Sequence, residues 1–323
     1  MDNILVSINC VTYNHENYIS DAIDSFLKQK TKFKYEILIH DDASTDRTVE
    51  IIKEYQNKYP DIIKPIFQTE NQYIKGVKVY LINVDRAKGK YIANCDGDDF
   101  WTDPYKLQKQ VDYMEKHPEC SICVHASNIV NTSNEEISFN RPSKVDKVFS
   151  VGEVIEGGGN LFGTSSMFYR TDLAKNKPDF YDIVPDISDY PVVINLSLLG
   201  TVYYMEKVMS SYRVGDEGSW TAKNLSDKMK KKEHYSTIAK LLDEVNRFTK
   251  YKYNDAITRT KRRTEFMLLL EDKNFKKAKK EYKDLYFELS YKKRLIIFLD
   301  YYTPKLSQLL RVAIKRVKVW RMT

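Results

Sequence analysis

The residues best suited to chemistry stand together after one short apolar run, as Asp96-Gly97-Asp98-Asp99. Three carboxylates within four residues repel one another, so a strand end that keeps them usually has a counter-ion. Hard oxygen ligands in an open site suit Mg²⁺ or Mn²⁺, which keep water ligands and bind substrate phosphates. Gly97 favours this interpretation, because a backbone without Cβ can approach a ligand closely. The alternative is a solvated acidic turn.

Two other polar clusters, Thr12-Tyr13-Asn14 and His40-Asp41-Asp42, also lie at the ends of apolar runs. Helical patterns separate these runs, and alternating strands and helices predict a parallel α/β sheet. Ligands of open α/β sheets bind beyond the carboxyl ends of the strands, so we expect the three clusters to meet at one edge. The strands of this half are predicted at residues 4–11, 35–40, 62–67 and 91–95.

The chain then continues with further elements of both kinds. Residues 131–160 are polar or Gly-rich and predict a loop. Helices are predicted at 106–116 and 192–199, and strands at 120–130, 165–169 and 203–212.

Composition and charge divide the chain at about residue 222. Hydrophobic residues make up 42% and charged residues 30% of the 323 residues, as in a soluble globular protein. Residues 1–222 hold 24 Lys and Arg against 33 Asp and Glu, whereas residues 223–323 hold 28 against 12. We therefore expect an α/β domain at 1–222, with a first half of about 1–100 and a second of about 101–222, and a basic helical region at 223–323.

Several classes of protein are excluded by what the sequence lacks. Four Cys in a chain of this length do not make a disulfide framework and predict reduced, buried thiols. The first residues lack a basic, apolar leader, and no window of 18 uncharged apolar residues predicts a membrane span. We expect a cytoplasmic protein.

Three stretches in order resemble the family 2 glycosyltransferases of the GT-A fold. They are VSINCVTYNHENYISDAIDSFLKQ, YEILIHDDASTDRTVEII and RAKGKYIANCDGDDFW. The family pattern is an opening strand with a Y-N loop, a strand ending in D-D-x-S-x-D, then A-x-G-x-Y-I and D-x-D-D. Each motif is weak alone, but the ordered set covers about 110 residues, and a looser resemblance continues to about residue 220.

The resemblance assigns the nucleotide to residues on the predicted edge. Val11 and Tyr13 match positions that hold the base and ribose, and Asp42 matches the carboxylate that accepts a hydrogen bond from uracil. Asp96 matches the ribose contact. Lys75 stands where a point charge could meet the diphosphate, or it is a surface lysine. A packing role for Tyr13 and a turn or capping role for Asp42 are the alternatives.

The resemblance also assigns the metal, the donor sugar, the acceptor and the base. Asp98 matches the ligand of Mn²⁺ or Mg²⁺, Asp99 lies nearer the donor sugar, and Trp101 is assigned to the acceptor side. Asp189 matches the base that accepts the proton of the acceptor hydroxyl, with Asp186 as its nearest rival. An N-cap role for Asp189 before a proline is compatible with this assignment.

One departure concerns the second metal ligand. Relatives often read Y-R-x-H-x-G-G-x-W after the helix that follows the base, and Gly215 stands where that His would be. Asp216, Glu217 or water are the candidates to replace it. Trp220 is assigned to the acceptor, where it would stack on a sugar ring, and a core role is the alternative.

The resemblance implies an inverting, metal-dependent transferase with a UDP-sugar donor and a glycan or lipid-linked saccharide acceptor. Two other functions remain: a non-catalytic nucleotide-sugar-binding protein, which the missing His favours, and a sugar-phosphate nucleotidyltransferase. The second would carry a Gly-rich basic loop after the first strand, where this chain has Thr12 to Glu16.

The basic end of the chain predicts a different partner. Its last residues repeat apolar side chains at steps of three and four, with Lys and Arg on other faces, and a basic amphipathic helix suits the inner face of a membrane. Packing on the chain's own domain or in a homo-oligomer is the alternative. Nucleic acid is not expected, because the acidic first part would oppose it. The apolar steps are Leu306, Leu309, Leu310, Ala313, Val317 and Trp320.

Overall fold

The computed structural model describes residues 4–183, 189–216 and 227–303. Its contacts divide the chain into two compact units, residues 1–253 and 254–323. The boundary from composition, at 222, lies before helix α9 (Lys228–Phe248), which the contacts assign to the first unit.

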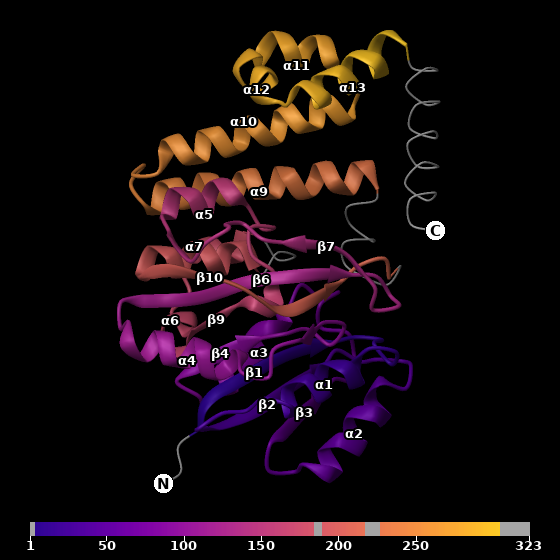
Figure 1. Cartoon of the computed structure of the whole chain (residues 1–323), viewed down its shortest axis with the longest axis vertical. Coiled ribbons are helices and arrows are strands. Elements are labelled where there is room, and N and C mark those ends of the chain that lie inside the picture. Colours follow the sequence, from indigo (N-terminus) through magenta and orange to yellow (C-terminus); the bar gives the residue numbers. More distant parts are fainter. Residues whose placement is uncertain (1–3, 184–188, 217–226, 304–323) are drawn as a thin grey trace. The chain divides into compact units, whose positions relative to one another are not determined.

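The first half of unit 1 alternates strands and helices, which confirms the predicted α/β class. Four strands pair in parallel in the order β3-β2-β1-β4. Because the order reverses after β3, right-handed connections place α1 and α2 on one face of the sheet and α3 on the other. Figure 1 labels these elements: β1 (Ile4–Thr12), α1 (Ile19–Leu27), β2 (Lys34–Asp41), α2 (Thr48–Lys58), β3 (Ile63–Phe67), α3 (Val79–Arg86) and β4 (Tyr91–Asn94).

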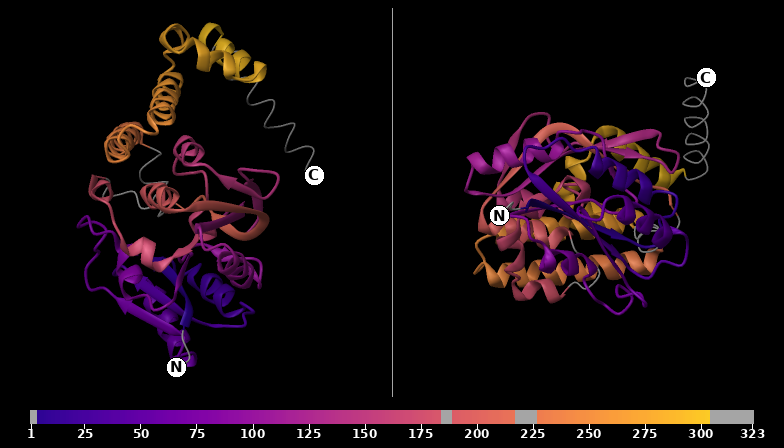
Figure 2. Two further views of the ribbon diagram at one scale, coloured as in Figure 1. Left: turned by 90° about the vertical axis from the view of Figure 1, so that its left-hand side faces the viewer. Right: turned by 90° about the horizontal axis from the view of Figure 1, so that it is seen from below.

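The second half extends the same sheet in mixed orientation. Strand β9 is antiparallel to both β4 and β6, whereas β10 runs parallel to β6. Figure 2 gives two further views of this arrangement. The elements are β5 (Phe100–Trp101), α4 (Lys106–Lys116), β6 (Cys120–Val130), β7 (Glu136–Asn140), β8 (Lys147–Phe149), α5 (Val151–Gly157), the 3₁₀ turn η1 (Thr164–Ser166), β9 (Phe168–Arg170), α6 (Thr171–Lys175), the 3₁₀ turn η2 (Asp179–Ile183), α7 (Asp189–Leu199) and β10 (Thr201–Arg213).

The segment predicted as a loop at 131–160 contains structure of its own. It holds β7, β8 and α5, and α5 begins with a capping box in which Ser150 and Glu153 bond each other's backbone N–H groups. Its polar composition misled the prediction because β7 lies on one edge of the sheet with most side chains exposed.

The register of the sheet aligns the strand ends that carry the polar clusters. Thr12 lies opposite Asp41 in the β1–β2 pair, and Asn9 lies opposite Asn94 in the β1–β4 pair. The polar residues that follow β1, β2 and β4 therefore meet at one edge, as the sequence predicts.

Unit 2 is a small helical body with its own core. Phe266, Ala278 and Leu285 form that core. Among the residues described, no helix is long and apolar enough to cross a bilayer. The helices are α10 (Asn254–Glu271), α11 (Phe275–Glu281), α12 (Lys283–Glu288) and α13 (Tyr291–Tyr302).

Lys106 is a basic residue whose side chain is fully buried in the core of unit 1. Lys106, at the start of α4, donates to Gln110 Oε1 at 2.8 Å, and its Nζ lies 4.1 Å from the centre of the Trp101 ring. The four Cys are also buried, with free thiols. Burial lowers the pKa of Lys106 to about 7, so its neutral amine is adapted to this site.

This burial predicts a dependence of stability on pH. Between about pH 7 and the ordinary value of 10.5, the unfolded chain holds the Lys106 proton and the folded chain does not, so stability rises with pH. Relative to Lys106→Met, we expect the wild-type free energy of unfolding to increase by roughly 1 kcal/mol per pH unit across this window. Urea denaturation measures it. The partly exposed Lys109→Met is the control and should run parallel to the wild type. A constant difference between wild type and Lys106→Met would contradict the assignment.

Candidate active site

The acidic turn after β4 is locked against the end of β1. The Gly97 N–H donates to the Val11 carbonyl oxygen at 2.9 Å, and the Asp99 N–H donates to the Asp96 carbonyl oxygen at 3.1 Å. A Cβ on residue 97 would lie 2.6 Å from Thr12 Oγ1, so only glycine allows this approach. The site therefore depends on contact between two segments of the chain whose touching residues, Val11 and Gly97, are 86 positions apart in sequence.

The three carboxylates of this turn have different surroundings. Asp99 is buried and accepts the Arg213 backbone N–H at 2.9 Å, whereas the Asp98 side chain is 21% exposed. Burial, followed by the charges of Asp98 and Asp189, raises the pKa of Asp96 well above its usual value. Burial and the Asp98 charge do the same for Asp99. Burial thus disfavours the charged forms of Asp96 and Asp99, whereas the Asp98 side chain is partly exposed to solvent.

Arg213, the last residue of β10, contacts the acidic turn through a buried side chain. Its side chain is 1% exposed, and its Nε donates to the Asp98 carbonyl oxygen at 2.8 Å. The guanidinium also donates to Asp21 at 3.2 Å and lies 4.4 Å from the centre of the Tyr18 ring. A planar, permanently charged fork can make these contacts at once, which a lysine cannot. The sequence analysis gave this residue no role; its place at the end of a strand, two residues before Gly215, was the available signal.

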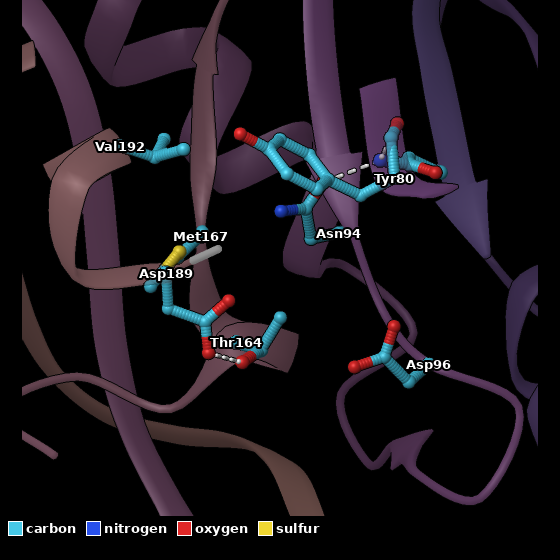
Figure 3. Close-up of a pocket in the computed structure, with 8 residues that line it drawn as sticks. Tyr80, Asn94, Asp96, Thr164, Met167, Asp189 and Val192 are labelled. Carbon is cyan, nitrogen blue, oxygen red and sulfur yellow. Dashed lines mark hydrogen bonds between the residues drawn. The ribbon is translucent and has the colours of Figure 1, made fainter. Parts of the chain in front are cut away.

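A pocket opens beside the turn, and two of its carboxylates come from separate halves of the sheet. Figure 3 shows Asp96 on one side and Asp189 on the other, with both carboxyl groups directed into the space between them. The pocket is lined by Asn9, Tyr80, Asn94, Asp96, Thr164, Met167, Asp189 and Val192.

Asp189 is positioned by the start of a helix and by a threonine. It is the first residue of α7, where the helix dipole favours a negative charge. Thr164 Oγ1 donates to Asp189 Oδ2 at 2.5 Å. One carboxylate oxygen is therefore oriented by the protein while the group faces the pocket. Its rival Asp186 lies outside the described residues.

Asp42 is placed at the expected edge but makes contacts that the sequence did not reveal. It is 2% exposed, and its carboxylate accepts the backbone N–H groups of Gln72 at 2.8 Å and Tyr73 at 3.1 Å. These contacts anchor the loop after β3, which corresponds to the alternative turn role. Val11 and Tyr13 are half-buried at the same edge.

Of the predicted site residues that the structure describes, only Asp96 and Asp189 line this pocket, and two of the others depart from their expected setting. Lys75 is exposed and forms an ion pair with Glu70. Trp101 was assigned to the acceptor, but it is 5% exposed and its Nε1 donates to the Ser165 carbonyl oxygen at 3.0 Å. This is a correction: the ring packs in the core, where Phe26 and Lys106 cover it, and it offers no open face to a sugar.

The residues offered for the second metal ligand are only partly described. Gly215 has φ of +93°, a conformation that favours glycine. Asp216 accepts a hydrogen bond from the Tyr18 hydroxyl at 2.9 Å. Glu217 and Trp220 lie outside the described residues. Within the described part of the chain, no group of three or more His, Cys, Asp or Glu side chains is arranged to hold a metal ion.

Comparison with known proteins identifies relatives whose similarity covers part of this chain. The family model described as glycosyl transferase family 2 matches residues 7–175. An uncharacterized protein of Mycobacterium tuberculosis is 35% identical over 218 residues, which cover 67% of this chain and 60% of that protein. The Escherichia coli UDP-Glc:alpha-D-GlcNAc-diphosphoundecaprenol beta-1,3-glucosyltransferase WfgD is 33% identical over 146 residues, 45% of this chain and 54% of its own length. The chain thus spans about 60% of the length of the first of these relatives.

Solved structures show the same GT-A fold. TarS residues 1–349 from S. aureus, in complex with UDP-GlcNAc, superpose with a TM-score of 0.55 and 17% identity, covering 75% of this chain and 67% of that one. The mannosyltransferase PcManGT from Pyrobaculum calidifontis, in complex with GDP-Man and Mn²⁺, gives 0.52 and 16%, covering 76% and 65%.

The buried guanidinium of Arg213 predicts a loss of stability when this side chain is replaced. Arg213→Met removes donors from the Asp98 carbonyl oxygen and from a carboxylate, so we expect it to lower the free energy of unfolding by about 2–4 kcal/mol. The control Arg141→Met removes an exposed ion pair with Glu206 and should cost less than about 1 kcal/mol. Equal losses for both variants, measured by urea denaturation, would refute a special role for Arg213.

Proposed function

Because this chain belongs to glycosyl transferase family 2, we propose that it moves a sugar from a UDP-sugar to a glycan or lipid-linked saccharide, with inversion at the anomeric carbon. The family makes the chain a glycosyltransferase. The donor, the acceptor and the stereochemical outcome are the parts that we propose.

The facing carboxylates of Asp96 and Asp189 carry the proposal. One belongs to the turn assigned to the donor, and the other begins a helix in the opposite half of the sheet. In a single displacement, the acceptor oxygen bonds to the anomeric carbon as the bond to the diphosphate breaks. Asp189 accepts the hydroxyl proton, while Thr164 holds one of its oxygens in place. No enzyme nucleophile is required.

The nucleotide is proposed at the strand edge, against Val11 and Tyr13, with the ribose at Asp96. A uridine nucleotide is supported by the names of two similar proteins, which bind UDP-GlcNAc or use UDP-Glc. The Asp42 carboxylate can accept further hydrogen bonds beyond the two from the 72–73 backbone, so contact with uracil is compatible with its role in the loop.

A divalent cation, Mn²⁺ or Mg²⁺, is proposed at Asp98. The donor set fits a hard cation, because the Asp98 carboxylate is partly exposed and a diphosphate would supply further oxygen ligands. Such a cation would offset the charge that grows on the leaving diphosphate. A similar protein has been solved with GDP-Man and Mn²⁺. Asp99 is buried and accepts the Arg213 backbone N–H, so its proposed role is to hold the turn in place near the donor sugar.

The role of Asp189 predicts a specific kinetic result. A screen of UDP-sugars for hydrolysis first identifies the donor. Asp189→Asn should then lower transfer by about 10²–10⁴-fold while donor affinity stays within about twofold, because the base acts only on the acceptor. Asp96→Asn should weaken donor binding itself. Near-normal transfer by Asp189→Asn together with a dead Asp186→Asn variant would mean that the base is Asp186.

Association with the inner face of a membrane is proposed for unit 2. Helix α13 has no buried residue and exposes Tyr291, Leu295, Phe298 and Tyr302 at steps of four, three and four, which place them on one face. Lys292 and Lys293 are exposed beside this stripe. Aromatic and aliphatic side chains flanked by lysines suit an anionic lipid surface. The amphipathic pattern at 305–323 lies outside the described residues.

This proposal predicts binding to vesicles of anionic phospholipid. Replacing both Leu295 and Phe298 with Glu should reduce binding about tenfold or more, and salt should weaken the wild-type interaction. Met267→Glu changes an exposed apolar residue of α10 and is the control. If the wild type does not bind vesicles, and light scattering shows an oligomer for the wild type and a monomer for the double variant, the surface is a homo-oligomer interface instead.

A further inference from the structure

His15 faces the proposed cation site, and the family assignment gave it no role. It follows β1 in the loop that packs on the acidic turn, and its side chain is 20% exposed. Its backbone N–H donates to Thr48 Oγ1 at 2.9 Å, which fixes the main chain. Its ring is held by Thr12, whose Oγ1 lies 3.1 Å from His15 Nδ1.

The distance between His15 and Asp98 indicates a shared ligand. His15 Nε2 and Asp98 Oδ2 are 3.9 Å apart, which is too long for a hydrogen bond. Nitrogen and oxygen ligands each lie roughly 2.1 Å from a divalent metal, so two ligands of one ion are separated by up to about 4.2 Å. The two atoms therefore stand within the span of a single cation without a change of backbone.

The hydrogen bond of the other ring nitrogen suits this role. When Nδ1–H donates to the Thr12 hydroxyl, Nε2 carries the lone pair that is directed toward Asp98. Metal-binding histidines commonly use their second nitrogen in this way, which fixes both tautomer and orientation. The absence of a side chain at Gly97 allows the contact, because a Cβ there would lie 2.6 Å from Thr12 Oγ1 and 3.1 Å from His15 Nδ1.

We propose that His15 Nε2 binds the divalent cation together with Asp98, so that the first loop supplies the nitrogen ligand that Gly215 cannot. The inference rests on the proposed function, because the remaining ligands are the diphosphate oxygens of the donor and water. The inference has a consequence for the choice of metal. An imidazole ligand favours Mn²⁺ over Mg²⁺, whereas a site made only of oxygen ligands suits both ions.

The test measures the metal directly, on the full chain with UDP and Mn²⁺. Pulsed electron paramagnetic resonance of bound Mn²⁺ should detect a coupled histidine nitrogen in the wild type, and His15→Ala should lose it. Titration should show Mn²⁺ affinity falling about tenfold or more in His15→Ala, with a smaller loss for Mg²⁺. His117→Ala, which alters a half-exposed histidine paired with Glu119, is the control and should change neither. His15→Gln keeps a polar side chain of similar reach in case the alanine variant does not fold.

The outcomes separate the inference from the proposed function. If Asp98→Asn abolishes Mn²⁺ binding but the nitrogen signal persists in His15→Ala and His15→Gln, His15 is not a ligand, and the metal-dependent transferase stands. If wild-type UDP affinity is the same in EDTA as in Mn²⁺, both the ligand and the metal dependence are wrong.

Discussion

The acidic turn after β4 depends on one buried arginine. Three carboxylates within four residues repel one another, and backbone hydrogen bonds from Gly97 and Asp99 hold only part of the turn against this repulsion. Arg213 adds a further restraint, since its Nε donates to the Asp98 carbonyl oxygen and its backbone N–H donates to the Asp99 carboxylate. Because the guanidinium binds backbone there, the Asp98 carboxylate stays available.

The sequence predicted best where local pattern and topology coincide. The strands β1, β2 and β4 and their common edge were expected. Apolar runs of strand length are buried because of their own composition, and the parallel topology then determines at which edge their ends lie. The resemblance assigned separate roles to Asp96 and Asp189, and the structure adds that both side chains line one pocket.

The misplaced residues are those whose neighbours come from distant parts of the chain. Trp101 adjoins the acidic turn in sequence, but its ring is covered by Phe26 and Lys106 and its nitrogen is bonded to Ser165. The limit expected from composition, at residue 222, and the division of the contacts, after residue 253, differ by helix α9. Helix α9 is rich in lysine, but it buries Leu241 and other apolar residues within unit 1. An amphipathic pattern predicts that one face of a helix is buried, but it does not predict which part of the protein covers that face.

The sheet itself fixes the proposed base relative to the donor turn. The Asn94 N–H, just before the turn, donates to the Met167 carbonyl oxygen at 3.0 Å, and β9 then pairs antiparallel with β4. Thr164, which orients Asp189, begins the 3₁₀ turn that leads into β9. The relative placement of Asp96 and Asp189 is therefore set by backbone hydrogen bonds between the two halves. Loops around this frame can vary without moving these two carboxylates.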